Sequence, residues 1–211
     1  MQLHEPETLL DGRYVILSLV GKGGMGAVYK ARDIRLHDRI VAVKQMLEED
    51  DGDLDYVRKQ LDNESRVLQQ LKHPTIPGIV DYFTDELATY VVMEFVEGTS
   101  LDHMLQQHQA AHGAPLPPEV VLEYALKICD TLIYLHAQDP PVIHRDIKPQ
   151  NILVKESGEI ALVDFGLARS NVSAGTKTLV GTLGYAPLEQ FKGRPDVRSD
   201  LYGLGATMFH L

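Results

Sequence analysis

The spacing of apolar residues changes near residue 97, and this change limits the possible folds more than any other feature of the sequence. Before it, short apolar runs predict β-strands, with one helix between Leu54 and Leu71. The predicted strands cover residues 14–19, 27–30, 40–44 and 90–95. We therefore expect a small lobe that is mostly β-sheet.

After Glu97-Gly98 the apolar residues recur at helical spacing. Ser100 is a suitable N-cap for a helix that runs to Gln109, and Pro118 suits the first turn of a longer helix. Short strand-like pieces lie at residues 142–143, 152–154 and 160–163, and a last helix is expected over 201–211. The predicted fold class is α+β, with the β-rich lobe followed by a larger helical lobe.

Composition narrows the partners and the compartment. The 211 residues include 20 Lys and Arg against 30 Asp and Glu, a net charge of −10, which argues against nucleic acid or an anionic membrane as the main partner. No apolar run reaches the ~18 residues of a membrane span, and the acidic start is unlike a signal peptide. With a single cysteine, Cys129, we expect a reducing, cytoplasmic environment, although a longer parent chain could be membrane-anchored.

A glycine-rich turn separates the first two predicted strands. It reads Gly21-x-Gly23-x-x-Gly26-x-Val28. Glycines let a backbone approach a ligand closely and direct N–H groups at anions, so the turn could hold phosphates. It does not open a helix, which disfavours a dinucleotide-binding turn, and taken alone it is equally compatible with an ordinary hairpin.

Two charged residues stand in apolar surroundings. Glu64 lies on the stripe formed by Leu61 and Leu68 of the predicted helix, where a buried carboxylate would need a cation. Lys44 ends an apolar strand and shares a face with Ala42. Each could instead reach solvent, which is the commoner situation for such residues.

Three further motifs follow in order: Val41-Ala42-Val43-Lys44, then His144-Arg145-Asp146-Ile147-Lys148-Pro149-Gln150-Asn151, then Asp164-Phe165-Gly166. With the glycine-rich turn, this set resembles the eukaryotic-like protein kinases, most closely the bacterial serine/threonine kinases. The resemblance runs from Tyr14 to the end of the chain. It implies a bilobal kinase fold with an N-lobe over 14–95 and a C-lobe over 96–211.

The resemblance implies an ATP-dependent transfer of phosphate to protein serine and threonine hydroxyls. Asp146 would orient the hydroxyl and accept its proton, and Lys148 would steady the γ-phosphate. Asn151 and Asp164 would hold Mg²⁺ through oxygen atoms. Lys44 would hold the α- and β-phosphates and pair with Glu64.

The resemblance also implies an ATP site. Val20, Val28, Ala42 and Leu153 would enclose the adenine, Met93 would be the gatekeeper, and the backbones of Glu94 and Val96 would meet the adenine edge. The phosphates would lie under the turn formed by Gly21, Lys22, Gly23, Gly24, Met25 and Gly26. Leu68, Ile79, His144 and Phe165 match the regulatory stack of the family.

Residues 164–189 correspond to the activation segment of such kinases. Thr176 and Thr178 are the expected phosphorylation sites, with Arg145 as the receiver of a phosphate, and self-association would allow autophosphorylation in trans. Thr182 corresponds to the structural threonine near Asp146.

Two departures from the family pattern qualify these expectations. Pro187-Leu188-Glu189 replaces Ala-Pro-Glu, and the chain stops at Leu211, near the central helix of the large lobe. We therefore expect a C-terminally incomplete kinase domain over 1–211, whose last helix leaves Leu201, Leu204, Met208 and Leu211 uncovered. Two alternatives stay open: an inactive fragment that serves as a nucleotide-binding or docking module, and a small-molecule kinase.

Overall fold

The computed structural model describes residues 3–23, 26–46, 67–85, 88–165 and 182–211. The chain divides into two compact units, each described here by itself. Unit 1 comprises Met1–Lys72 and Pro77–Val96, and unit 2 comprises His73–Ile76 and Glu97–Leu211. The predicted α+β class is confirmed. Gly24, Met25, Glu64, Thr176 and Thr178 lie outside the described residues.

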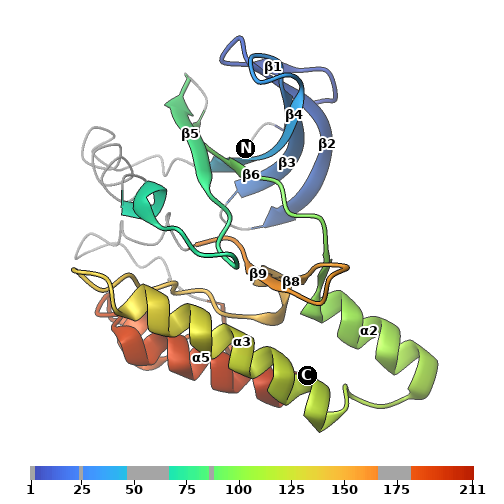
Figure 1. Ribbon diagram of the computed structural model, residues 1–211, viewed down its shortest axis with the longest axis vertical. Coiled ribbons are helices and arrows are strands. Elements are labelled where there is room, and N and C mark those ends of the chain that lie inside the picture. Colours follow the sequence, from blue (N-terminus) through green and yellow to red (C-terminus); the bar gives the residue numbers. More distant parts are fainter. Residues whose placement is uncertain (1–2, 24–25, 47–66, 86–87, 166–181) are drawn as a thin grey trace. The chain divides into compact units, whose positions relative to one another are not determined.

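Unit 1 is built on one six-stranded antiparallel sheet with the order β1-β2-β3-β4-β6-β5 (Figure 1). Its strands are β1 (Leu9–Leu10), β2 (Tyr14–Gly23), β3 (Gly26–Asp33), β4 (Arg39–Met46), β5 (Ile79–Thr84) and β6 (Thr89–Glu94). The predicted hairpin is confirmed, since β2 and β3 pair up to Gly23 opposite Gly26. Of the helix expected before Leu71, residues 67–70 are described and helical.

One face of this sheet carries the core of unit 1. Tyr29, Val43 and Val92 lie opposite one another across β3, β4 and β6, and all three are fully buried. The ring of Phe83 stacks between Tyr14 and Tyr90, with centroids 5.7 Å and 4.7 Å away. Because side chains alternate along a strand, residues one position away in β3, β4 and β6 belong to the opposite face.

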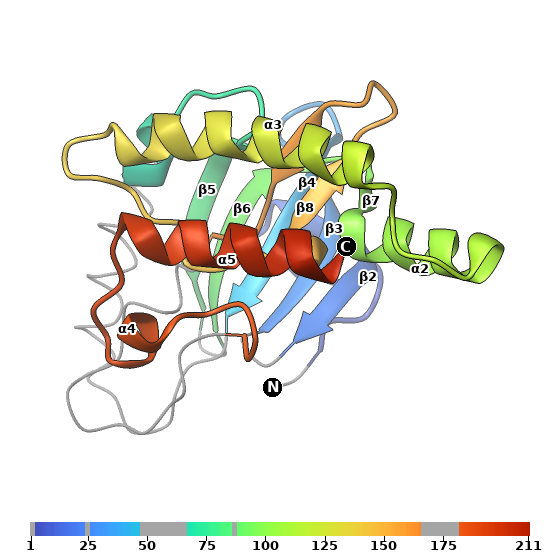
Figure 2. The same ribbon diagram turned by 90° about the horizontal axis from the view of Figure 1, so that it is seen from below.

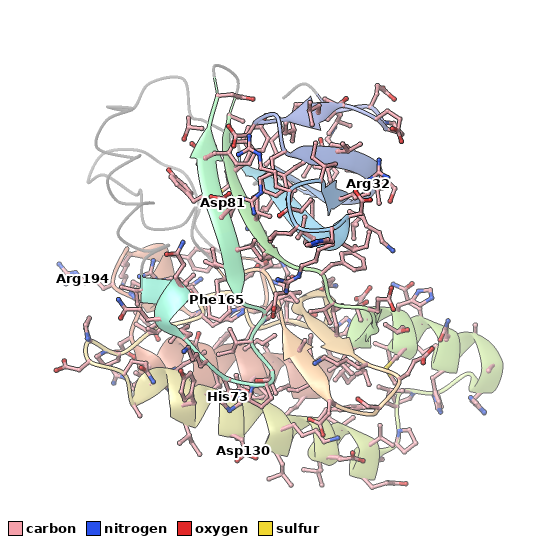
Figure 3. All side chains as sticks on the ribbon, turned by 45° about the horizontal axis from the view of Figure 1, so that its top comes forward. Arg32, His73, Asp81, Asp130, Phe165 and Arg194 are labelled. Carbon is pink, nitrogen blue, oxygen red and sulfur yellow. The ribbon has the colours of Figure 1, made fainter. Side chains whose placement is uncertain are left out.

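Strand β5 was not predicted, because Asp81 interrupts its apolar run. In the structure this carboxylate accepts hydrogen bonds from Arg13 Nη1 and from the Tyr14 hydroxyl, both at 2.6 Å (Figure 3). Arg13 also forms a two-point ion pair with the buried Asp33. Asp81 is therefore held by a cation and a hydroxyl from the start of β2, a strand that does not pair with β5.

Unit 2 contains three longer elements that were expected. Helix α2 (Leu101–His112) is capped by the Ser100 hydroxyl, which accepts from the His103 amide, and it extends one turn beyond the predicted end. Helix α3 (Pro118–His136) begins at the predicted proline. Helix α5 (Val197–His210) starts at an Asp196 capping box and lies alongside α3 (Figure 2).

The expectation that the last helix leaves its apolar stripe uncovered is wrong for two residues. Leu204 and Leu211 are both 5% exposed, whereas Leu201 is 52% exposed. The Leu211 carbonyl also accepts a hydrogen bond from the Leu116 amide at 2.8 Å, before α3 begins. Leu204 and Leu211 are therefore covered within unit 2, and Met208 is half-buried. Among the described residues, no helix is long and apolar enough to cross a bilayer.

Short elements complete unit 2. A three-stranded sheet has the order β7-β8-β9, with β7 (Thr99–Ser100), β8 (Ile152–Val154) and β9 (Ile160–Leu162). A 3₁₀ turn, η1 (Pro149–Asn151), precedes β8, and a short helix, α4 (Leu188–Phe191), precedes α5. The predicted strand at 142–143 is wrong: the Val142 amide donates to the Leu135 carbonyl at the end of α3, so no partner strand receives it.

Four residues that precede β5 belong to unit 2. The Thr75 carbonyl accepts from the Leu162 amide at 2.7 Å, and its hydroxyl shares a 2.7 Å hydrogen bond with Thr131. The His73 ring stacks on Tyr134 with centroids 4.9 Å apart, above α3 in Figure 3. These contacts attach His73–Ile76 to α3 and β9 rather than to the sheet of unit 1.

Candidate active site

The loop that carries Asp146 is held by a carboxylate from α5. Asp200 is 1% exposed, and its Oδ1 accepts from the Arg145 amide at 2.8 Å. Its Oδ2 accepts from the His144 amide at 2.9 Å and from His136 Nε2 at 2.8 Å. Three donors therefore satisfy the buried carboxylate, as burial of a charge requires. The loop can follow an irregular path without a partner strand because a side chain replaces it.

Asp146, Lys148 and Thr182 form a closed ring of polar contacts. Lys148 Nζ lies 2.9 Å from Asp146 Oδ2 and donates to Thr182 Oγ1 at 3.0 Å. The Thr182 hydroxyl in turn donates to Asp146 Oδ1 at 3.0 Å. Asp146 is 4% exposed, so its carboxylate is oriented in a site with little water. The structure therefore brings the two predicted catalytic residues together with the threonine of the activation segment.

Asn151 is oriented by the same carboxylate. Its Nδ2 donates to Asp146 Oδ2 and to the Asp146 carbonyl, both at 2.9 Å. Because the amide nitrogen is turned to Asp146, its Oδ1 points elsewhere and can serve as a ligand to a hard cation. The bond orders the side chain that was predicted to bind metal.

The β8–β9 hairpin places Asp164 beside Asn151. Ile152 pairs with Leu162, and the Val163 amide donates to the Asn151 carbonyl at 2.9 Å. Asp164 is the next residue after Val163, so its backbone lies near Asn151. Asp164 has a left-handed backbone with φ 62°. In the described part of the chain, no group of three or more His, Cys, Asp or Glu side chains is placed to hold a metal. Two oxygen ligands with phosphate and water suit Mg²⁺, which usually keeps several non-protein ligands.

His144 has a structural place in the loop that carries Asp146. It is fully buried, its Nδ1 accepts from the Asp146 amide at 3.3 Å, and its ring lies 4.5 Å from that of Phe165. Two of the four residues expected in the regulatory stack therefore meet in unit 2. Leu68 and Ile79 are the two expected from unit 1.

In unit 1, one face of the sheet gathers residues predicted to bind ATP. Ala42 lies opposite Met93, and Lys44 lies opposite Val28, so all four share the face turned away from the tyrosine core. Lys44 is 5% exposed and Ala42 is 8% exposed. A small side chain beside a buried lysine on one face leaves space for a flat ring whose phosphates extend toward the ammonium group.

The glycine-rich turn is exposed at its start and tight at its end. Gly21, Lys22, Gly23 and the preceding Val20 are exposed. A Cβ added at Gly26, which has φ 141°, would lie 1.9 Å from the Gln45 carbonyl oxygen. Gly26 is therefore required by its close approach to β4, whereas the exposed part of the turn can cover a ligand.

Glu94, Val96 and Leu153, which were expected near adenine, differ in their hydrogen bonds and in their places in the fold. The Glu94 amide donates to the Gly78 carbonyl at 2.9 Å, and its side chain accepts from Arg39 at 2.7 Å and from the Gly78 amide at 3.1 Å. Val96 closes unit 1, and Leu153 lies in β8 of unit 2. Both side chains are half-buried.

Two contributors to the site were missed from the sequence. His136 donates to Asp200, and Gln190, which is 2% exposed, donates through Nε2 to the Arg145 carbonyl at 2.7 Å. For Gln190 the one available signal was its position next to Glu189, at the end of the expected activation segment.

Comparison with known proteins places these features in context. The profile of the protein kinase domain matches residues 14–211. A probable serine/threonine-protein kinase of Clostridium perfringens is 38% identical over 207 residues, which cover 96% of this chain and 29% of that protein. Serine/threonine-protein kinase PrkC of Bacillus subtilis is 36% identical over 206 residues, with 96% and 30% covered.

A solved structure shares the fold. The crystal structure of a PknI kinase domain variant from Mycobacterium tuberculosis has a TM-score of 0.78 and 24% sequence identity, and the match covers all of this chain and 77% of that one. The present chain thus spans under a third of the length of the two curated relatives and most of the solved kinase domain.

Proposed function

Because the chain belongs to the protein kinase domain family, we propose that it is an ATP-dependent serine/threonine protein kinase. The observation that carries this proposal is the ring of Asp146, Lys148 and Thr182, with Asn151 bound to the same carboxylate. Phosphoryl transfer depends on positioned charges more than on covalent catalysis, and this ring supplies an oriented carboxylate beside a cation.

The reaction assigns one task to each group. The oxygen of a substrate hydroxyl attacks the γ-phosphorus of ATP, the bond from that phosphorus to the bridging oxygen breaks, and ADP leaves with the electron pair. The carboxylate of Asp146 orients the hydroxyl and accepts its proton. Lys148 donates to a γ-phosphate oxygen and offsets its charge.

Residues of unit 1 would bind the rest of the nucleotide. Lys44 would donate to the α- and β-phosphates, and Ala42, Val28 and Met93 would contact the adenine from their shared sheet face. Since the Glu94 amide already donates to Gly78, the Glu94 backbone would offer adenine its carbonyl as an acceptor. For Glu94, the backbone atom expected to contact adenine is therefore the carbonyl oxygen.

The proposed metal is Mg²⁺, held by Asn151 Oδ1 and the carboxylate of Asp164. When bound, it would supply positive charge that offsets the charge of the phosphates. The chain's own contribution is the orientation of these ligands, through the bond from Asn151 to Asp146 and through the β8–β9 pairing.

Lys148 and the segment rich in Ser and Thr that ends at Glu189 favour protein substrates over small alcohols. We also propose autophosphorylation on Thr176 and Thr178. Arg145, which directly precedes Asp146 in the chain, supports this proposal. Its guanidinium group is suited to bind a phosphate through two hydrogen bonds.

The test is intact mass before and after incubation with Mg-ATP, with and without casein as a protein acceptor. The parent chain should transfer phosphate to casein and gain phosphate itself, mapped to residues 170–182. Asp146→Asn keeps the shape of the side chain, so it should fold, with a melting temperature lowered by the loss of the charge, and transfer about 10²–10⁴ times more slowly. If neither protein transfers phosphate while ATP raises the melting temperature of both, the chain is a nucleotide-binding module instead.

A further inference from the structure

Gln190 contacts the loop that carries Asp146, although it lies 44 positions later in the sequence and outside the motifs that identify the site. It lies in α4, is 2% exposed, and its Nε2 donates to the Arg145 carbonyl at 2.7 Å. That carbonyl belongs to the peptide unit that joins Arg145 to Asp146. The hydrogen bond therefore acts on the backbone immediately before the proposed catalytic carboxylate.

Arg145 has a backbone conformation that needs support. Its φ is 68°, in the left-handed region, which is unfavourable for a residue with a Cβ. Such a conformation persists where the surroundings hold it in place. The φ and ψ angles of a residue are set by the orientations of the two peptide units that flank its Cα atom.

Both of these peptide units are held by buried side chains. On the N-terminal side, Asp200 Oδ1 accepts from the Arg145 amide at 2.8 Å. On the C-terminal side, Gln190 Nε2 donates to the Arg145 carbonyl at 2.7 Å. The amide of the same unit also donates to His144 Nδ1, through a longer bond of 3.3 Å. Without the Gln190 bond, the carbonyl side of this unit would lose its donor, and the backbone that supports the Asp146 carboxylate would be held less firmly.

The segment that ends in α4 thus contacts the catalytic loop at two points. Thr182 donates to the Asp146 side chain, and Gln190 donates to the backbone before it. Between them lie Pro187 and Leu188, where the sequence departs from the usual Ala-Pro-Glu pattern.

We propose that Gln190 is a positioning residue that holds the Arg145–Asp146 peptide unit and so aims the Asp146 carboxylate at the substrate hydroxyl. The inference rests on the proposed kinase activity. It assigns Gln190 an effect on the transfer step and none on the binding of ATP.

The test replaces Gln190 by Met, which has a similar length and volume but no donor. Gln138→Met is the matched control, because Gln138 Nε2 also donates to a main-chain carbonyl, that of Tyr134, at 2.8 Å. Activity toward casein, melting temperature and amide hydrogen exchange of peptides that contain residues 143–148 are measured for the parent and both variants.

We expect Gln190→Met to lower kcat about tenfold with KM for ATP within twofold of the parent, because the peptide unit before Asp146 loses its buried donor while the ATP-binding residues are untouched. Exchange should speed up at residues 144–146. Gln138→Met should leave kcat and this exchange unchanged. A parent without activity contradicts the proposed function, and the exchange measurement then still tests the positioning role.

Equal kcat values for the two variants, or unchanged exchange at residues 144–146, would overturn the inference. If Gln190→Met does not fold, Gln190→Leu takes its place in the same measurements. Failure of both to fold would show that Gln190 supports unit 2 as a whole, which also contradicts a role confined to the loop.

Discussion

Single residues in the candidate site act mostly through hydrogen bonds to one carboxylate. Asp146 Oδ1 accepts a hydrogen bond from Thr182, and its Oδ2 accepts one from Asn151 and lies 2.9 Å from Lys148 Nζ. Hydrogen bonds to a charged group contribute about 1.5–3 kcal/mol, more than neutral ones. Removal of one donor should therefore misdirect the carboxylate without unfolding the unit.

Thr182→Val removes the hydroxyl that links Lys148 to Asp146 and keeps the side-chain shape. We expect kcat to fall roughly tenfold or more, with KM for ATP near the parent value, because about 1.4 kcal/mol corresponds to a factor of ten. Steady-state kinetics with casein measure it. A kcat equal to that of the parent would show that Lys148 and Asp146 hold their geometry without the threonine.

In helix α5, the same substitution at Thr207 should affect stability instead of activity. Thr207 is 1% exposed, and within the described parts of the chain its Oγ1 has no hydrogen-bond partner. Replacing a buried hydroxyl without a partner by a methyl group should raise the free energy of unfolding by about 1 kcal/mol and leave kcat unchanged. A loss of stability measured in urea would indicate a partner for this hydroxyl.

The sequence made Asp146, Lys148, Asn151 and Asp164 recognisable, because each belongs to a short motif with a chemical reason for its residue types. Gln190 was missed for a physical reason. Its partner is a main-chain carbonyl, and any residue supplies one, so no residue pattern indicates which carbonyl a glutamine reaches.

At the scale of elements, helix α5 contains two glycines with different surroundings. A Cβ added to Gly203 would lie 3.0 Å from the Ile147 carbonyl oxygen and 3.1 Å from Ile147 Cβ, whereas one added to Gly205 would meet nothing within 4 Å. Helix α5 therefore lies close to the loop that carries Asp146 at Gly203, which faces Ile147.

Gly205→Ala should stabilise α5 by about 0.5–1 kcal/mol, because alanine loses less backbone entropy than glycine in a helix. Gly203→Ala should not show this gain, since the loop must move by a few tenths of an ångström, and its kcat should fall. Thermal unfolding and casein phosphorylation distinguish the two variants. Equal stabilisation by both would mean that the loop yields without cost.

Asp33, the last residue of β3, predicts a pH dependence of the stability of unit 1. Burial alone would raise the pKa of Asp33, but hydrogen bonds from Arg13 and from the Arg35 amide outweigh it and hold this pKa below its usual value. The folded pKa is thus lower than the unfolded one, so the stability from this group is present above about pH 4 and is lost as the pH falls through the folded pKa.

Asp33→Asn should therefore flatten the loss of stability between pH 5 and pH 2, measured by urea unfolding followed by circular dichroism. Arg13→Met should cost about 3 kcal/mol at pH 7, because it leaves the buried carboxylate without its cation. A parent-like pH profile for Asp33→Asn would exclude Asp33 as the source of the dependence.

Element types could be predicted where one periodicity ran without interruption, as in α3 and in β4. They were missed where a polar residue had partners elsewhere in the sequence, as Asp81 of β5 has at the start of β2. The strand expected at 142–143 failed for the opposite reason, because apolar residues there bond to a helix end. The partners of Asp81 lie more than 60 residues away in the sequence, and the partner of Val142 is a main-chain carbonyl, so local residue patterns indicate neither.

At the scale of the whole molecule, the chain passes between its two units after Lys72, after Ile76 and after Val96. The sequence indicated a change of character only at the last of these places. The two earlier ones escape notice because the four residues from His73 to Ile76 show no periodicity, and they join unit 2 through Thr75, His73 and their partners.

This path predicts how fragments behave. A fragment of residues 97–211 loses the Thr75 partners of Leu162 and Thr131 and the His73 ring on Tyr134. We expect it to melt at a lower temperature than unit 2 within the whole chain, and a peptide of residues 71–78 added in excess to raise its melting temperature. No response to the peptide would show that the segment contributes little to unit 2.

The same feature limits how the gene could be divided or rearranged. A single cut after Val96 yields two fragments, and the first of them retains residues His73–Ile76 of unit 2. Exchange of the first unit between related proteins would therefore carry four residues that must fit a foreign α3 and β9. Recombination that keeps each unit intact needs junctions on both sides of His73–Ile76 as well as after Val96. Exchange of both units together avoids these three junctions.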